Sequence, residues 1–171
     1  MRNTLIVGGV AAVAVVVGAF VLIQNDSRDA SGAPAEAPVT SLAAVAVPFT
    51  ELRHGTQSSV SERVNYLIDT QAEFDRLWKV MGATGEKPPV DFTTHSVIAS
   101  FSGKKPTGGY AISIAKVEDT DVRMVTVTVA KPGGGCMTAQ SITAPYVLVE
   151  VPKTSLALAH EDVATTTDCS R

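Results

Sequence analysis

The chain has 171 residues, of which 45% are hydrophobic and 18% are charged, and its 17 acidic and 14 basic side chains leave a net charge of −3. This apolar content excludes full disorder, and 13 glycines and 9 prolines are too few for a fibrous protein. The slightly acidic balance argues against binding to nucleic acid or, by charge alone, to an anionic membrane surface, because both attract cationic proteins.

Residues 5–23 form an uninterrupted apolar segment near the start of the chain. At about 1.5 Å per residue, a helix of this length spans roughly 28 Å, close to the ~30 Å bilayer core. The apolar region of a secretory signal peptide is usually only about 7–15 residues long. We therefore expect residues 1–23 to be a short cytoplasmic tail and a single-pass transmembrane anchor in the cell membrane. The alternative is a cleaved signal peptide, which would leave a secreted protein.

Residues 24–47 are rich in alanine, proline and serine and show no steady helical or strand period. This composition is typical of a flexible linker. Residues 48–171 then have the size of a single domain with one hydrophobic core. Because the expected anchor precedes this domain, we expect the domain to be extracytoplasmic.

One amphipathic helix is predicted in this domain. Residues 70–73 read Thr-Gln-Ala-Glu, a capping box in which the first and last side chains satisfy unpaired backbone amides at a helix start. The residues that follow at helical spacing on one apolar stripe are Phe74, Leu77, Trp78 and Met81. Gly82 can end the helix in a left-handed conformation. Since Trp78 lies on the stripe, we expect it to pack in the core rather than to bind a ligand.

The rest of the domain shows strand patterns. Residues 60–68, 96–101 and 146–151 have the length and composition of strands, the last bounded by prolines on both sides. Residues 110–115 and 123–129 alternate in polarity and are joined by a polar turn, which predicts a hairpin. The expected fold class is α+β, a compact antiparallel β-rich domain with one helix.

The residues that most often carry chemistry do not converge in the sequence. His54, His95 and His160 are far apart and show none of the spacings that hold a metal. We therefore predict no catalytic residue, no metal site and no cofactor. Cys136 and Cys169 are the only cysteines, and in an oxidising compartment we expect them to form a disulfide. The alternative is that Cys136, which follows three glycines, acts as a nucleophile.

One loop between two expected strands is the candidate binding element. Its proline fixes one φ angle, its paired glycines permit positive φ, and two lysines and an aromatic side chain lie beside them. A rigid, exposed turn of this kind suits contact with a partner, although glycines in a tight connection also explain it. The predicted partner-binding residues are Lys104, Lys105, Pro106, Thr107, Gly108, Gly109 and Tyr110.

Several motifs in the second half of the chain resemble the PrcB C-terminal domain family. They are the segments at residues 90–92, 97–103, 105–110, 131–133, 139–146 and 149–152, and the resemblance runs from about Val64 to Lys153. Members of that family are exported or membrane-attached bacterial proteins, and the namesake is an accessory subunit that stabilises a surface protease complex. The chain departs from the lipoprotein form of the namesake, because no cysteine closely follows the expected anchor to carry a lipid; this departure concerns the mode of attachment and not the domain.

The resemblance implies a non-enzymatic protein-interaction module in the bacterial envelope. We expect an accessory subunit that stabilises or positions an envelope protein such as a protease. A second hypothesis comes from the similarity of residues 106–110 to a loop of chagasin-type cysteine-protease inhibitors, and makes this loop a wedge that enters a protease cleft. A third hypothesis is a protein that binds a small ligand.

Overall fold

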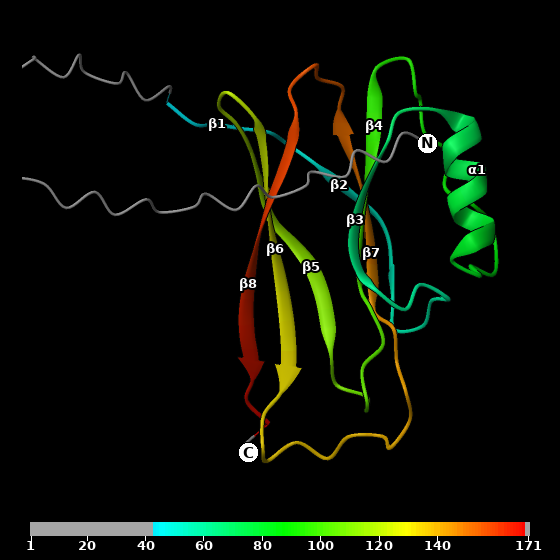
Figure 1. Cartoon of the computed structure of the whole chain (residues 1–171), viewed down its shortest axis with the longest axis vertical. Helices are drawn as coiled ribbons and strands as arrows, with labels where there is room; N and C mark the ends of the chain where they lie inside the picture. The colour runs from blue at the N-terminus through cyan, green and yellow to red at the C-terminus, as the bar shows by residue number, and fades with distance from the viewer. Residues whose placement is uncertain (1–42, 170–171) are drawn as a thin grey trace, which may run out of the picture. The chain divides into compact units, whose positions relative to one another are not determined.

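Two four-stranded sheets and one helix make up residues 43–169, the part of the chain that this computed structural model describes (Figure 1). One sheet has the strand order β2-β7-β4-β3 and the other the order β1-β5-β6-β8. The elements are β1 (Val45–Ala46), β2 (Thr50–Gly55), β3 (Arg63–Ile68), α1 (Gln71–Val80), β4 (His95–Ser102), β5 (Ala111–Asp119), β6 (Arg123–Pro132), β7 (Tyr146–Pro152) and β8 (Leu158–Thr167). The α+β class and the β-rich domain with one helix are confirmed.

The expected membrane anchor at residues 5–23 lies outside the described residues, as do residues 24–42 of the expected linker. Between residues 43 and 169, no helix is long and apolar enough to span a bilayer.

The helix begins and ends as its sequence predicts. The Thr70 hydroxyl accepts a hydrogen bond from the Glu73 amide at 3.3 Å, and the Glu73 carboxylate accepts one from the Asp69 amide at 3.2 Å. Both bonds occupy donors that a helix start otherwise leaves unpaired. Met81 caps the other end, and Gly82 follows with a φ of +68°. The Thr70 hydroxyl, which donates to the Glu73 carboxylate at 2.9 Å, and the Asp69 amide hold the pKa of the Glu73 carboxyl below its ordinary value.

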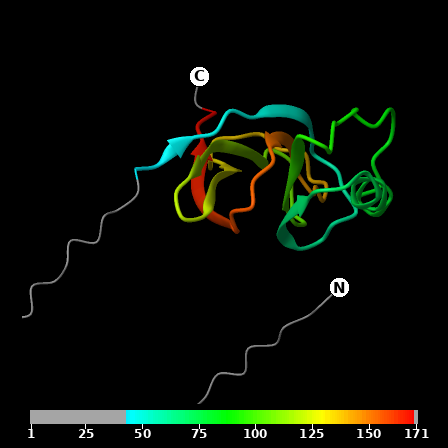
Figure 2. The same cartoon turned by 90° about the horizontal axis from the view of Figure 1, so that it is seen from above.

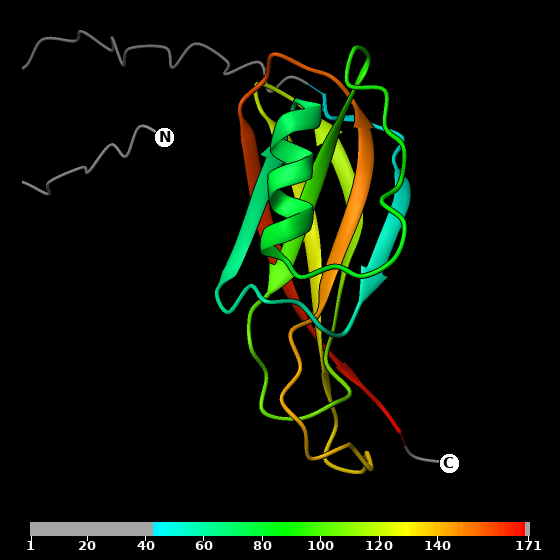
Figure 3. The ribbon, with the colours of Figure 1, turned by 90° about the vertical axis from the view of Figure 1, so that its right-hand side faces the viewer.

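The β2-β7-β4-β3 sheet is the middle layer, with α1 on one face and the second sheet on the other (Figures 1 and 3). Val97 of β4 packs with Phe74 and the other buried residues of α1, whereas the adjacent Ile98 packs between the sheets with Val127 of β6. Successive side chains of a strand point to opposite faces of the sheet, so a strand in the middle layer buries the side chains on both of its faces. This explains the unbroken apolar runs in β4 and β7.

Most strand pairs are antiparallel, and the predicted hairpin is β5 and β6, with a register shift between Ile114 and Lys116. The exception is β8, which pairs in parallel with β6 from Arg123↔Leu158 to Pro132↔Thr167. The expected antiparallel pairing therefore holds for the described strand pairs except that of β6 with β8. The cause is that β7 lies in the other sheet, so the chain crosses between sheets twice before β8 returns beside β6. Figure 2 shows α1 and β8 on opposite sides of the layers.

The first strand lies within the segment expected to be linker. Val45 and Ala46 pair with Asp119 and Glu118 at the end of β5, and the Val47 amide donates to the Val117 carbonyl at 2.8 Å. The chain then crosses to the other sheet, where β2 pairs with β7. The expected boundary at residue 48 therefore comes too late, because strand pairing already includes Val45.

Candidate partner-binding surface

Three connections and the last residues of β8 lie at one end of the sandwich, which we call the loop end. The connections are residues 56–62, 103–110 and 133–145. Their common location follows from the strand registers, which pair Gly55 and Phe101 with Tyr146 and pair Pro132 with Thr167. Figure 3 shows the 103–110 and 133–145 connections below the sheets. The turn between β5 and β6, at residues 120–122, marks the opposite end, which we call the hairpin end.

The 103–110 connection is held along its length by the backbone of the 133–145 connection. The Lys105 amide donates to the Thr143 carbonyl at 2.7 Å, and the Thr143 amide donates back to the Lys105 carbonyl at 3.0 Å. The Gly108 amide donates to the Ala139 carbonyl at 2.9 Å, and the Thr143 hydroxyl donates to the Thr107 carbonyl at 2.8 Å. The candidate loop is therefore one half of a surface built from two segments.

The two adjacent glycines of the loop have different roles. Gly109 has a φ of +83°, and a Cβ there would lie 3.0 Å from side-chain carbons of both Pro132 and Thr138. Gly108 does not have a positive φ, and a Cβ there would be 3.5 Å from Ala139, an ordinary contact. Only Gly109 is required by the backbone and by the close approach of its neighbours.

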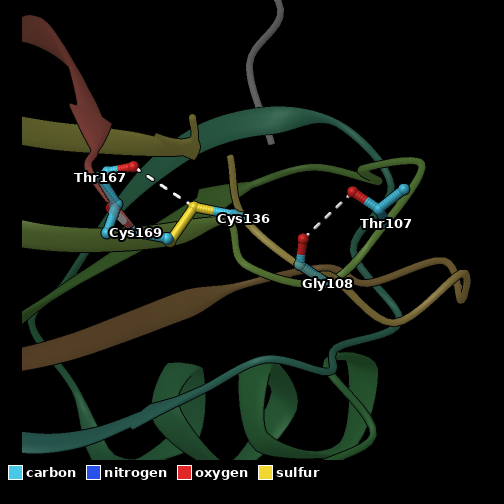
Figure 4. The surroundings of a disulfide bond; sticks show 5 residues. All are labelled: Thr107, Gly108, Cys136, Thr167 and Cys169. Carbon is cyan, nitrogen blue, oxygen red and sulfur yellow. Dashed lines mark hydrogen bonds between the residues drawn. A yellow bond between two sulfur atoms is a disulfide. The ribbon is translucent and has the colours of Figure 1, made fainter. Parts of the chain in front are cut away.

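A disulfide fixes the 133–145 connection to the C-terminal end of β8 (Figure 4). Cys136 and Cys169 are bonded, with their Cα atoms 5.0 Å apart, which confirms the predicted pair. Beside the disulfide, the Gly133 amide donates to the Thr167 carbonyl at 3.0 Å. In this structure Cys136 has no free thiol, so the nucleophile alternative has no support.

Large apolar side chains are exposed at the loop end. Met137 is fully exposed and Ile142 is 63% exposed, and both belong to the 133–145 connection. An open hollow of about 240 Å³ lies between the glycines of the 103–110 loop and the disulfide, and Met137 and Pro132 contribute to its lining. Exposed apolar groups around a hollow are typical of a surface that binds another protein.

Lysines are the only charged residues of the two paired connections and of the strand segments next to them. Between residues 96 and 117, and again between residues 124 and 149, the sequence contains no aspartate or glutamate. Lys104 and Lys131 are exposed, and the half-buried Lys105 lies with its Nζ 5.9 Å from the centre of the Tyr110 ring. The loop end also contains two acidic residues, Glu62 in the 56–62 connection and Asp168 after β8.

The three histidines lie apart, on β2, β4 and β8. His54 contacts Glu51 at 2.6 Å, and His95 lies 3.9 Å from Glu150 in a separate hollow of about 190 Å³ at the hairpin end. Within residues 43–169, no group of three histidine, cysteine, aspartate or glutamate side chains is placed to hold a metal ion.

The comparison with protein families gives one match. The model of the PrcB C-terminal family matches residues 96–152. This match confirms, over these residues, the resemblance predicted from the sequence motifs. The PrcB C-terminal match begins in β4 and ends with β7, so it contains both the 103–110 and the 133–145 connections. No curated protein and no solved structure matches the chain. The similarity of residues 106–110 to chagasin-type inhibitors stays a prediction.

The sequence predicts one of the two paired segments as a binding element, and this stays a prediction; it does not predict the other. Residues 139–146 carry a motif of the family, but nothing local indicates that they pair with the loop. The Met-Thr-Ala-Gln sequence after Cys136 contains a large apolar residue among small and polar ones. A large apolar residue in an otherwise polar loop is the one feature of the sequence that indicates an exposed contact residue here.

Proposed function

We propose that this protein is a non-enzymatic accessory subunit of an envelope protease complex, and that it uses the loop end to bind and stabilise its partner. The observation that carries the proposal is the PrcB C-terminal match, because it contains both of the connections that form the candidate surface. The bonds between Lys105 and Thr143 support a preformed surface, which loses little conformational entropy when a partner binds.

The position of β1 also supports this proposal. Val45 and Ala46 pair with the end of β5 at the hairpin end, so the described part of the chain starts at the end opposite the candidate surface. If residues 5–23 anchor the protein in the cell membrane, a tether of this kind leaves the loop end free for an extracytoplasmic partner.

The test is affinity capture of the full-length protein from gently solubilised membranes, with mass spectrometry of the proteins that co-purify. The variant Met137→Ser/Ile142→Ser removes the two exposed apolar side chains of the loop end. Its control is Val80→Ser, which removes a side chain of similar exposure, 65%, from α1. We expect a stoichiometric protease partner with the wild type and the control, and its loss with the loop-end variant. Equal capture by all three proteins would contradict the proposal.

A second measurement separates an accessory subunit from an inhibitor. The purified protein is added at equal molar amount to the captured protease, and both turnover of a peptide substrate and the survival of the protease over time are recorded. A stabilising subunit prolongs survival without lowering initial turnover. A stoichiometric fall in initial turnover would instead support the wedge hypothesis for residues 106–110.

A further inference from the structure

The loop end combines an apolar hollow with a border of positive charge, and this combination restricts what can bind there. The hollow of about 240 Å³ has the backbone of Gly108 and Gly109 on one side and Cys136, Met137 and Cys169 on another. It is large enough for one aliphatic side chain but not for a helix, whose diameter with side chains is about 10–12 Å. The geometry therefore favours an extended segment that inserts a single side chain.

The hollow is held open by fixed structure. The disulfide holds Cys136 at the end of β8, and the Gly108 amide is bonded to the Ala139 carbonyl across the paired connections. A Cβ at Gly109 would be 3.0 Å from Pro132 and Thr138, so the backbone on that side already lies against its neighbours. A preformed hollow of this kind can accept a side chain without first reorganising.

The charges around the hollow favour an acidic partner segment. Lys131 directly precedes Pro132, which lines the hollow, and Lys104 and Lys105 lie at the start of the loop whose glycines form the other side. Glu62 and Asp168 offset part of this charge, yet the three lysines outnumber them, although the whole chain carries a net charge of −3. Complementary charges across an interface select the partner and accelerate association.

We propose that the loop end binds an extended, acidic segment of the partner protein, with one aliphatic side chain in the hollow beside the disulfide and flanking carboxylates on Lys104, Lys105 and Lys131. This inference rests on the proposed function and specifies the chemistry of its partner. The main chain of the bound segment runs past Met137, whose exposed side chain lines the hollow and covers the inserted residue from solvent.

The first arm of the test uses charge reversal in the full-length protein. In Lys104→Glu/Lys131→Glu, we expect partner capture to fall about tenfold, because acidic side chains then face acidic side chains. The control Lys79→Glu/Lys153→Glu changes the net charge of the protein equally, but at α1 and at the hairpin end. Its capture should stay within about twofold of wild type. The variant Lys104→Gln/Lys131→Gln should fall between the two.

The second arm identifies the bound segment. Photoreactive benzoylphenylalanine replaces Met137 in one protein and Ser155, at the hairpin end, in a control, and the cross-linked peptides are sequenced after irradiation of the producing cells. We expect the peptide linked through position 137 to contain an aliphatic residue flanked by aspartate or glutamate. A neutral or basic peptide, or equal capture by both charge-reversed proteins, would overturn the inference but leave the accessory role intact. No cross-linked protein above the Ser155 control would overturn both.

Discussion

Arg63 on β3 and Asp162 on β8 form an ion pair that joins the edges of the two sheets. The Nε atom of Arg63 donates to Oδ2 of Asp162 at 2.8 Å, and its Nη2 atom donates to Oδ1. Asp162 lies opposite Val127, a core residue between the sheets, so it occupies an inward-facing position of an edge strand. An inward-facing charge discourages pairing of this edge with a strand of another molecule.

This pair makes stability depend on pH in the acid range. The hydrogen bonds and the positive charge of Arg63 hold the pKa of Asp162 below its ordinary value. Because the folded pKa is the lower one, the contribution to stability is present above about pH 4 and is lost as the pH falls through the depressed pKa. The side chains of Arg63 and Asp162 are 26% and 38% exposed, so we expect only about 0.5–1 kcal/mol.

Urea unfolding of wild type and Asp162→Asn at pH 7 and at pH 2 measures this contribution. We expect the variant to be less stable than wild type at pH 7, and this difference to be smaller at pH 2 because the Asp162 carboxylate takes up a proton as the pH falls. Glu86→Gln, an exposed residue between α1 and β4, should not change this difference. An equal loss at both pH values would show that the ion pair is not the cause.

Arg123 is expected to contribute more to the stability of the fold than Arg63 does. Its side chain is 4% exposed, and it donates from Nε and Nη2 to the two carboxylate oxygens of Asp119 at 2.8 Å each. A third donor, Nη1, bonds to the Pro152 carbonyl, so Arg123 connects the hairpin to the end of β7. Removal of this guanidinium leaves a partly buried carboxylate without its partner, which is costly.

We expect Arg123→Met to lower the free energy of unfolding by about 2–4 kcal/mol, measured by urea denaturation. The double variant Arg123→Met/Asp119→Leu should recover part of this loss, since it removes both charges. Arg76→Met, at an exposed position of α1, serves as the control and should have little effect. If the double variant lost as much as the sum of its single changes, the two residues would not be coupled.

The helix, the hairpin and the two buried strands of the middle layer could be predicted because their signals are local. The capping box at Thr70 and the apolar stripe from Phe74 indicate α1 without reference to any other segment. The strand β8 is not predicted from the sequence, because it is an edge strand and has little apolar pattern. Only its Leu158 packs against the core between the sheets. Its Glu161 and Asp162 also interrupt the apolar pattern that indicates a strand.

The candidate surface could be predicted only in part for the same reason. The glycines and lysines of the 103–110 loop are adjacent in the sequence, and the two cysteines have no other possible partner within the chain. The contact between Lys105 and Thr143, in contrast, joins residues far apart in the chain through backbone atoms. Backbone hydrogen bonds carry no residue-type signal, so the second segment of the surface became visible only in three dimensions.

The two loop glycines offer a matched pair of variants. Gly109→Ala places a Cβ at a φ of +83° and 3.0 Å from two neighbouring carbons, so we expect it to destabilise the protein by about 1–3 kcal/mol. Gly108→Ala meets only an ordinary contact and should be neutral within about 0.5 kcal/mol. Thermal unfolding compares them. A larger loss for Gly108→Ala than for Gly109→Ala would contradict the assigned backbone roles.

The disulfide should contribute both global stability and local order at the loop end. Its cysteines are 33 residues apart in sequence, for which the chain-entropy model gives about 3–4 kcal/mol. We therefore expect Cys136→Ser/Cys169→Ser to lose that amount in urea denaturation. The amides of Gly133 and Cys136, bonded to the carbonyls of Thr167 and Gly133, should also exchange with solvent faster in the variant.

Reduction provides the matched control for this last prediction. Dithiothreitol should lower the stability of the wild type to that of Cys136→Ser/Cys169→Ser and leave the variant unchanged, because the variant has no disulfide to reduce. The exchange of amides in β4 and β7 under native conditions should change less than that of Gly133, since those strands open only with the whole domain. A wild type that is unaffected by reductant in both stability and exchange would show that the bond does not support the loop end.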